Sequence, residues 1–275
     1  MLKKNKDFPA KRIAVITGGS GFLGQQHCIA LLEQGIIVYN FDLLPFDSLL
    51  IKELKFQHNF YDIECDITNE DSVESSFKKV IDDQGKIDIL INNASVDYKV
   101  LPNLSKNEKD FRFENFDFSS WHSELEVGLT GAIYCCKYAA KNMIENRSGI
   151  IVNISSDLGV IAPDQRIYMK KTTGHDDIRY FKPFSYSVIK HGLIGLTKYL
   201  ATYLAEFGIR VNTLSPGSIF NDQDPEFLTN LQSKIPLNRL AKVDEYKGAI
   251  QFLTSDSSSY MTGQNLIIDG GRSTW

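Results

Sequence analysis

Residues 13–24 read Ile13-Ala14-Val15-Ile16-Thr17-Gly18-Gly19-Ser20-Gly21-Phe22-Leu23-Gly24, and this stretch decides the fold. A short apolar run leads into a glycine-rich turn, after which Ile29, Leu31 and Leu32 recur at helical spacing. Glycines let a backbone approach a phosphate closely, and a helix N-terminus adds free N–H groups and a partial positive charge. The stretch therefore predicts a phosphate-binding strand, turn and helix, with an ordinary tight turn as the alternative.

The next apolar run, residues 36–41, ends at Asp42. A carboxylate at the carboxyl end of the second strand can accept hydrogen bonds from the ribose diol of an adenosine, and it would repel a 2′-phosphate. Residues 43–46 contain no Arg or Lys. The pattern favours NAD(H) over NADP(H), and the alternative for Asp42 is a loop carboxylate without a ligand.

Alternation of apolar runs and helical periods continues along the chain, and Thr68 is a plausible N-cap for a helix beginning near Glu70. We expect an α/β fold, a doubly wound (Rossmann) parallel sheet of about seven strands in a single domain. Residues 1–10 would be an N-terminal extension and 11–275 the domain, with insertions near 96–120 and 157–185. Further strands are expected at 62–68, 87–91, 150–156, 209–214 and 265–268, and long helical segments at 121–146 and after Tyr186.

Tyr186 and Lys190 are four residues apart in Tyr186-Ser187-Val188-Ile189-Lys190. On a helix they share a face, and an ammonium beside a phenol lowers the phenol pKa from its usual value near ~10. The pair could supply a proton-transfer group. Such pairs are also common on solvated helices, so the pattern alone leaves both readings open.

The bulk composition excludes several classes of partner. A net charge of −4 gives no global field for nucleic acid or anionic membrane. The four cysteines lack CxxC spacing and are expected to be buried free thiols in a reducing compartment. Without a signal sequence or an apolar run near ~20 residues, we expect a cytoplasmic protein, and we expect no metal site.

Several short motifs, each weak alone, occur in one order along residues 11–271: Thr17-Gly18-x-x-Gly21-x-x-Gly24, Asp66, Asn92-Asn93-Ala94, Ser156-x-x-Gly159, Tyr186-x-x-x-Lys190, Pro216-Gly217 and Asp269-Gly270-Gly271. Together they resemble the short-chain dehydrogenase/reductase family, in its single-domain branch.

This resemblance implies roles for particular residues. Ser156 would hydrogen-bond the substrate oxygen, Tyr186 would exchange its proton, and Lys190 would lower the pKa of Tyr186 and bind the nicotinamide ribose. Ser156, not Ser155, stands directly before the x-x-Gly159 step. With Tyr186 and Lys190, the residues implied to contact NAD are Gly18, Ser20, Gly21, Phe22, Leu23, Gly24, Asp42, Asp66, Ile67, Asn93, Ala94, Pro216 and Gly217.

The chain departs from the family pattern near this pair. Gly128 precedes Leu129-Thr130-Gly131, where the family has a catalytic asparagine in a proton relay, and Ser156 and Tyr186 are separated by an unusually long segment. We expect a weakened or water-filled relay, with turnover that rises in Gly128→Asn.

The resulting hypothesis is an NAD(H)-dependent oxidoreductase that interconverts a secondary alcohol and a ketone. A polyhydroxylated, anionic sugar derivative is indicated by the basic residues Lys170, Lys171, His175 and Arg179, and by a likeness of the Asp269–Trp275 ending to reductases of bacterial surface-sugar biosynthesis. For the basic segment a solvated surface loop is the alternative. Reduction of a 3-oxoacyl thioester and a non-catalytic NAD-sensing or scaffold role remain open. The resemblance also implies a homo-oligomer, a tetramer or a dimer, packed through the two long helices.

Overall fold

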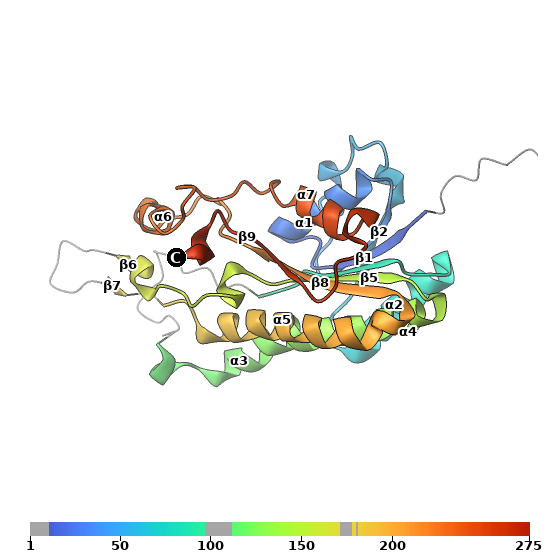
Figure 1. The fold of residues 1–275 in the computed structure, drawn as a ribbon, viewed down its shortest axis with the longest axis horizontal. Coiled ribbons are helices and arrows are strands. Elements are labelled where there is room, and N and C mark those ends of the chain that lie inside the picture. Colours follow the sequence, from blue (N-terminus) through green and yellow to red (C-terminus); the bar gives the residue numbers. More distant parts are fainter. Residues whose placement is uncertain (1–10, 97–111, 171–177, 180) are drawn as a thin grey trace, which may run out of the picture.

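A seven-stranded parallel sheet forms the centre of the computed structural model, which describes residues 11–96, 112–170, 178–179 and 181–275 (Figure 1). Its strand order is β3-β2-β1-β4-β5-β8-β9, and every neighbouring pair is parallel. The order reverses beside β1, as in doubly wound dinucleotide-binding folds. The strands are β1 (Ile13–Thr17), β2 (Ile37–Asp42), β3 (Phe60–Glu64), β4 (Ile89–Asn92), β5 (Gly149–Ile154), β8 (Ile209–Pro216) and β9 (Asn265–Ile268).

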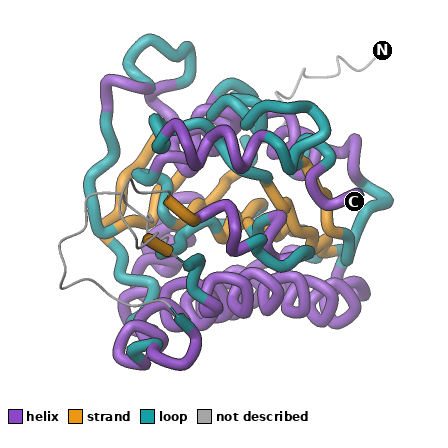
Figure 2. The backbone as a smooth tube through the Cα atoms, turned by 90° about the vertical axis from the view of Figure 1, so that its left-hand side faces the viewer, coloured by secondary structure: helices purple, strands orange, loops and turns teal. Residues whose placement is uncertain are grey.

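Helices cover both faces of the sheet (Figures 1 and 2). On one face lie α1 (Phe22–Leu32) and α7 (Lys247–Leu253), and on the other α2 (Glu70–Gln84), α4 (Gly131–Asn146) and α5 (Phe184–Leu204). Alternate residues of β1 enter opposite cores, with Val15 packing toward α2 and α4 and Ile16 toward α1 and α7. The predicted single-domain Rossmann fold is confirmed. A strand buried on both faces of the sheet must be apolar throughout, which is why the continuous apolar runs of the sequence predicted it.

Several predicted boundaries were wrong for local reasons. Asn69, not Thr68, caps α2, because the Asn69 side chain accepts from the N–H groups of Asp71 and Ser72, whereas the Thr68 hydroxyl donates to Asp66 at 2.7 Å. The third strand runs from Phe60 to Glu64 and ends before Asp66.

The helix predicted over 121–146 is interrupted. It consists of α3 (Phe118–Leu125), a π-helical turn over Glu126–Thr130 and then α4. Gly128 lies in the π turn, where a helix bends readily. The insertion near 96–120 falls largely outside the described residues. The segment after β5 contains a short antiparallel pair, β6 (Met169–Lys170) with β7 (Ile178–Arg179), and α6 (Pro225–Gln232) follows β8.

A row of buried polar side chains fixes α5 on the sheet. Asn153 of β5 accepts from Asn92 of β4 at 2.8 Å and donates to the Thr197 hydroxyl of α5 at 2.8 Å. Thr213 of β8 donates to the same hydroxyl at 2.7 Å. Each contact satisfies a group that could not reach water, so the row sets the position of α5 across three strands.

Asn153→Ala should therefore destabilise the protein through this row. We expect the free energy of unfolding to fall by roughly 1–3 kcal/mol, because the amide of Asn92 and the hydroxyl of Thr197 each lose a buried partner. Chemical denaturation measures the change. Gln34→Ala, which removes an exposed amide, is the control and should change stability by less than ~0.5 kcal/mol. Equal effects of the two variants would contradict the assigned role of the row.

Candidate active site

A cavity of about 1010 Å³ opens at the carboxyl ends of the strands, the edge at which doubly wound folds bind ligands. It brings together every residue that the sequence assigned to the cofactor or to catalysis. These are Gly18, Ser20, Gly21, Phe22, Leu23, Gly24, Asp42, Asp66, Ile67, Asn93, Ala94, Ser156, Tyr186, Lys190, Pro216 and Gly217. Asn92 does not line the cavity, and its side chain belongs to the buried row beneath it.

The glycine-rich turn between β1 and α1 forms one wall. Gly18 has φ +66°, and a Cβ there would lie 2.7 Å from Cα of Ala94, so only glycine fits without rearrangement. No side chain caps α1 after Gly21. The first residues of α1, Phe22, Leu23 and Gly24, line the cavity, so their uncapped N–H groups could bind a pyrophosphate.

Buried side chains hold this turn from below. The Asn40 side chain accepts from the Gly19 N–H at 2.9 Å and donates to Asp62 at 2.7 Å. Asn93 donates to the carbonyl of Gly18 at 2.8 Å. The turn is thus fixed before any ligand arrives. Burial lowers the pKa of His27 on α1 to about 3, so this imidazole contributes no positive charge beneath the turn.

Asp42 lies at the end of β2, as predicted, and is fixed by two backbone groups. Its carboxylate accepts from the N–H of Ser20 at 3.0 Å and from that of Leu44 at 3.1 Å. The cations among the described lining residues are Lys182, Lys190 and Arg272, and none comes from the segment around Asp42. Among the described residues, this end of the cavity therefore carries a carboxylate and no basic side chain to hold a 2′-phosphate.

Ser155 and Ser156 follow β5 and have different partners. Ser155 donates to the carbonyl of Lys190 at 2.8 Å and so anchors α5. Ser156 accepts from the Leu158 N–H at 3.1 Å and donates to the Asp157 carboxylate at 2.9 Å. The hydroxyl that the sequence assigned to substrate binding is therefore held by its neighbours.

Helix α5 places Tyr186 and Lys190 on the cavity, where Lys190 lies with its Nζ 5.6 Å from the centre of the Tyr186 ring. The Lys190 ammonium donates to the carbonyl of Ile154 at 3.1 Å and is buried. A second ammonium, that of Lys182, lies 3.9 Å from the centre of the same ring. Tyr186 thus has two ammonium groups near its ring, and nearby positive charge favours the phenolate form.

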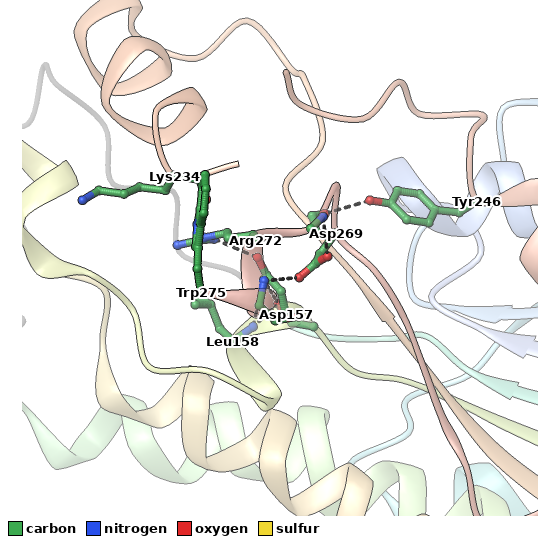
Figure 3. Close-up of polar contacts among 11 residues, drawn as sticks. Asp157, Leu158, Lys234, Tyr246, Asp269, Arg272 and Trp275 are labelled. Carbon is green, nitrogen blue, oxygen red and sulfur yellow. Dashed lines mark hydrogen bonds and ion pairs between the residues drawn. The ribbon is translucent and has the colours of Figure 1, made fainter. Parts of the chain in front are cut away.

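Three residues of the site were missed by the sequence reasoning. Lys182 stands four residues before Tyr186 but precedes the start of α5 at Phe184, so no helical spacing could have indicated it. Asp157 and Arg272 line the cavity and form a buried ion pair at 2.8 Å (Figure 3). No sequence pattern indicates a contact between two residues so far apart in the chain.

The basic residues of the 157–185 insertion are only partly described. Lys171 and His175 lie outside the described residues, and Lys170 and Arg179 belong to the β6–β7 pair. Arg166 forms an exposed pair with Asp164 at 2.7 Å and does not line the cavity. Within this insertion, Lys182 is the basic side chain that lines the cavity in the described part.

The four cysteines are free and buried, as predicted. Burial raises the pKa of Cys136 to about 12, so its thiol stays protonated and unreactive. Across the described ranges, no helix is both long and apolar enough to cross a membrane.

Fold and site together define a nicotinamide-dependent oxidoreductase of the Rossmann type. A family model described as enoyl-(acyl carrier protein) reductase matches residues 23–273. A short chain dehydrogenase from Leptospira borgpetersenii, solved with bound NAD⁺, is 32% identical with a TM-score of 0.78, covering 99% of this chain and 97% of that one.

Two further proteins are similar over nearly their whole length. The 3-oxoacyl-[acyl-carrier-protein] reductase of Synechocystis is 28% identical over 94% of this chain and 96% of its own. A gluconate 5-dehydrogenase from Burkholderia cenocepacia, solved with NADP and tartrate, is 25% identical with a TM-score of 0.80, covering 96% of each chain. The chain belongs to the short-chain dehydrogenase/reductase family.

The space around Gly128 changes one expectation from the sequence. A Cβ at Gly128 would lie 2.7 Å from Cγ2 of Ile189 on α5, a branched methyl that cannot swing away. An asparagine there would push the π turn away from the helix that carries Tyr186 and Lys190. The structure therefore leaves no space for the asparagine side chain, and a gain in turnover for Gly128→Asn is no longer expected.

We now expect Gly128→Asn to lower both turnover and the free energy of unfolding, the latter by about 1–3 kcal/mol, because it overpacks this contact. Gly128→Asn with Ile189→Ala removes the methyl and should turn over faster than Gly128→Asn alone. Gly248→Asn, at a helical glycine with open space beyond it, is the control. Initial rates and denaturation curves measure both effects. If Gly128→Asn alone turned over faster than the native protein, the overpacking argument would be wrong.

Proposed function

We propose that the protein is an NAD(H)-dependent oxidoreductase that interconverts a secondary alcohol and a ketone. The observation that carries the proposal is the meeting of Ser156, Tyr186 and Lys190 in the cavity that also contains the glycine turn and Asp42. Bound nicotinamide would supply or accept the hydride. The glycine turn, Asp42, Asp66 with Ile67, Asn93 with Ala94, and Pro216 with Gly217 would hold that cofactor.

The protein's own residues would handle the proton. Tyr186 would pass a proton to the substrate oxygen in reduction and take it back in oxidation, and the ammonium of Lys190 would favour the phenolate. Ser156 would hydrogen-bond the same oxygen and stabilise the charge that develops on it. A water-excluding cavity strengthens both interactions.

For substrate we favour a polyhydroxylated, anionic sugar derivative. The cavity is also lined by Ser218, Asn221, Gln223 and Lys182, which suit hydroxyl groups and one anion. A neighbour with a polyhydroxy acid in its name, the gluconate 5-dehydrogenase solved with tartrate, supports this class.

A 3-oxoacyl thioester is the second candidate, favoured by the name of the Synechocystis relative and by the description of the family model. Phe227, Ile167 and Leu231 give the cavity an apolar part that could contact an acyl chain. The 157–185 insertion also supplies Lys182 to the lining, and this cation favours the anionic, polar substrate.

We further propose a cytoplasmic homo-oligomer, a tetramer or a dimer. Exposed apolar side chains on α4 and α5, Ile133, Val188, Tyr199 and Tyr203, support packing through these helices. The four free thiols support a reducing compartment.

Cofactor preference tests the role of Asp42. We expect kcat/KM for NAD to exceed that for NADP by at least ~10²-fold, because a 2′-phosphate would meet the Asp42 carboxylate. Asp42→Asn should reduce this preference by about tenfold or more. The control is Glu64→Gln, an exposed carboxylate at the end of the adjacent strand that does not line the cavity. A native preference for NADP would contradict the proposal.

Tyr186→Phe tests the chemistry. Turnover should fall by about 10²–10⁴-fold, because the variant keeps the ring but loses the proton-transfer group, while NADH binding should stay within a few-fold. Reduced-nicotinamide absorbance is followed with sugars, sugar phosphates, nucleotide sugars and a 3-oxoacyl thioester as substrates. Tyr199→Phe, an exposed phenol on the same helix, is the matched control. Binding of NADH with no turnover of any substrate would favour the non-catalytic alternative.

A further inference from the structure

A buried carboxylate lies directly against the hydroxyl proposed to bind the substrate oxygen. Asp157 Oδ1 accepts from Ser156 Oγ at 2.9 Å and from the Leu158 N–H at 2.8 Å. Only 2% of the Asp157 surface and 6% of the Ser156 surface are exposed. A serine hydroxyl can donate one hydrogen bond, and here the Asp157 carboxylate accepts it.

This arrangement is unfavourable for the proposed reaction unless the carboxylate is compensated. Ser156 must donate its proton to the substrate oxygen, on which negative charge develops during reduction. An uncompensated Asp157 would compete with the substrate oxygen for that proton, and in a buried site this competition is little screened by solvent.

Arg272 supplies the compensation. Its Nη1 donates to Asp157 Oδ2 at 2.8 Å, on the side of the carboxylate away from Ser156, and only 5% of the Arg272 surface is exposed. Figure 3 shows Arg272 reaching from the last turn of the chain to Asp157. Each carboxylate oxygen thus has its own role, one toward Ser156 and one toward the guanidinium.

The turn that carries Arg272 is fixed on both sides. The Asp269 carboxylate accepts from the N–H groups of Gly271 at 2.9 Å and Ser273 at 2.7 Å. The Trp275 indole donates to the carbonyl of Lys234, just after α6, at 3.1 Å. The guanidinium is therefore held in place by the backbone around it, so little reorganisation is needed when substrate binds.

We propose that Arg272 and Asp157 are positioning residues for Ser156: Asp157 orients the hydroxyl, and Arg272 neutralises Asp157 so that the hydroxyl can donate to the substrate oxygen. This inference rests on the proposed function. It assigns a role in the chemistry to the C-terminal turn, whose Arg272 is linked to Ser156 through Asp157.

A double-mutant cycle between Arg272 and Ser156 tests it. Arg272→Gln should lower the rate of hydride transfer by about 10–100-fold, and Ser156→Ala by about 10²–10³-fold. Because Arg272 acts through the Ser156 hydroxyl, the double variant should be no slower than Ser156→Ala, within about threefold. If the two losses multiply, Arg272 does not act through Ser156 and the inference fails.

A second cycle separates neutralisation of Asp157 from any other effect of losing Arg272. In an Asp157→Asn background there is no charge to neutralise, so adding Arg272→Gln should cost less than about threefold in hydride transfer. A loss as large as in the native background would overturn the inference. Arg272→Lys keeps the positive charge and should retain more activity than Arg272→Gln.

Two further measurements separate positioning from folding. Melting temperature and NADH affinity are recorded for each variant, and the effect on hydride transfer should remain in variants whose NADH affinity is native. Arg239→Gln is the matched control, since it breaks the exposed pair of Arg239 with Glu245 away from the cavity and should leave turnover unchanged. If Ser156→Ala and Tyr186→Phe leave turnover intact, the proposed function itself fails. If both lower turnover as expected but the losses of Arg272→Gln and Ser156→Ala multiply, only the positioning role fails.

Discussion

The close contact between the turn after β5 and helix α5 is the constraint on which the site depends. Ser155 donates to the carbonyl of Lys190, and the Lys190 ammonium donates back to the carbonyl of Ile154. A Cβ at Gly159 would lie 3.0 Å from the carbonyl of Lys190 and closer still to the Ser155 hydroxyl, so a glycine is required there. This contact fixes the distance between Ser156 on the turn and Tyr186 on the helix.

The same contact explains why two adjacent serines have separate tasks. Both serines line the cavity, but their hydroxyls have different partners: Ser155 donates to the carbonyl of Lys190 on α5, and Ser156 donates to Asp157 in its own turn. One hydroxyl anchors the helix, and the other is the one proposed to bind the substrate oxygen. The spacing of Ser156 from Gly159 is therefore set by the packing of this turn against α5 as well as by the proposed role of Ser156.

The features that the sequence predicted are those with local patterns. Continuous apolar runs such as 13–16 mark strands buried on both faces, and glycines such as Gly18 mark a turn that admits no side chain. The whole proposed cofactor site follows, because parallel strands bring their carboxyl ends to one edge. Its roles in binding remain predictions, whereas the fold and the family are established.

The features that the sequence did not predict depend on competition or on distant partners. Thr68 and Asn69 are both good caps, and the nearby Asp66 decides between them by taking the Thr68 hydroxyl. Asp157 and Arg272 are 115 residues apart, and no periodicity connects them. Only the folded chain shows that a residue in a common C-terminal motif reaches the catalytic edge.

The charges of the cavity separate chemistry from substrate recognition. Arg272 is committed to Asp157, and Lys190 is held on the carbonyl of Ile154, so neither can turn toward an anion without breaking a buried contact. Lys182 is half-buried at the wall, over the Tyr186 ring. An anionic substrate would therefore be recognised from the Lys182 side, and its binding would place a negative charge near Tyr186, the residue proposed to give up its proton. The two ammonium groups beside Tyr186 offset that effect, since one remains on the ring when the other meets the substrate.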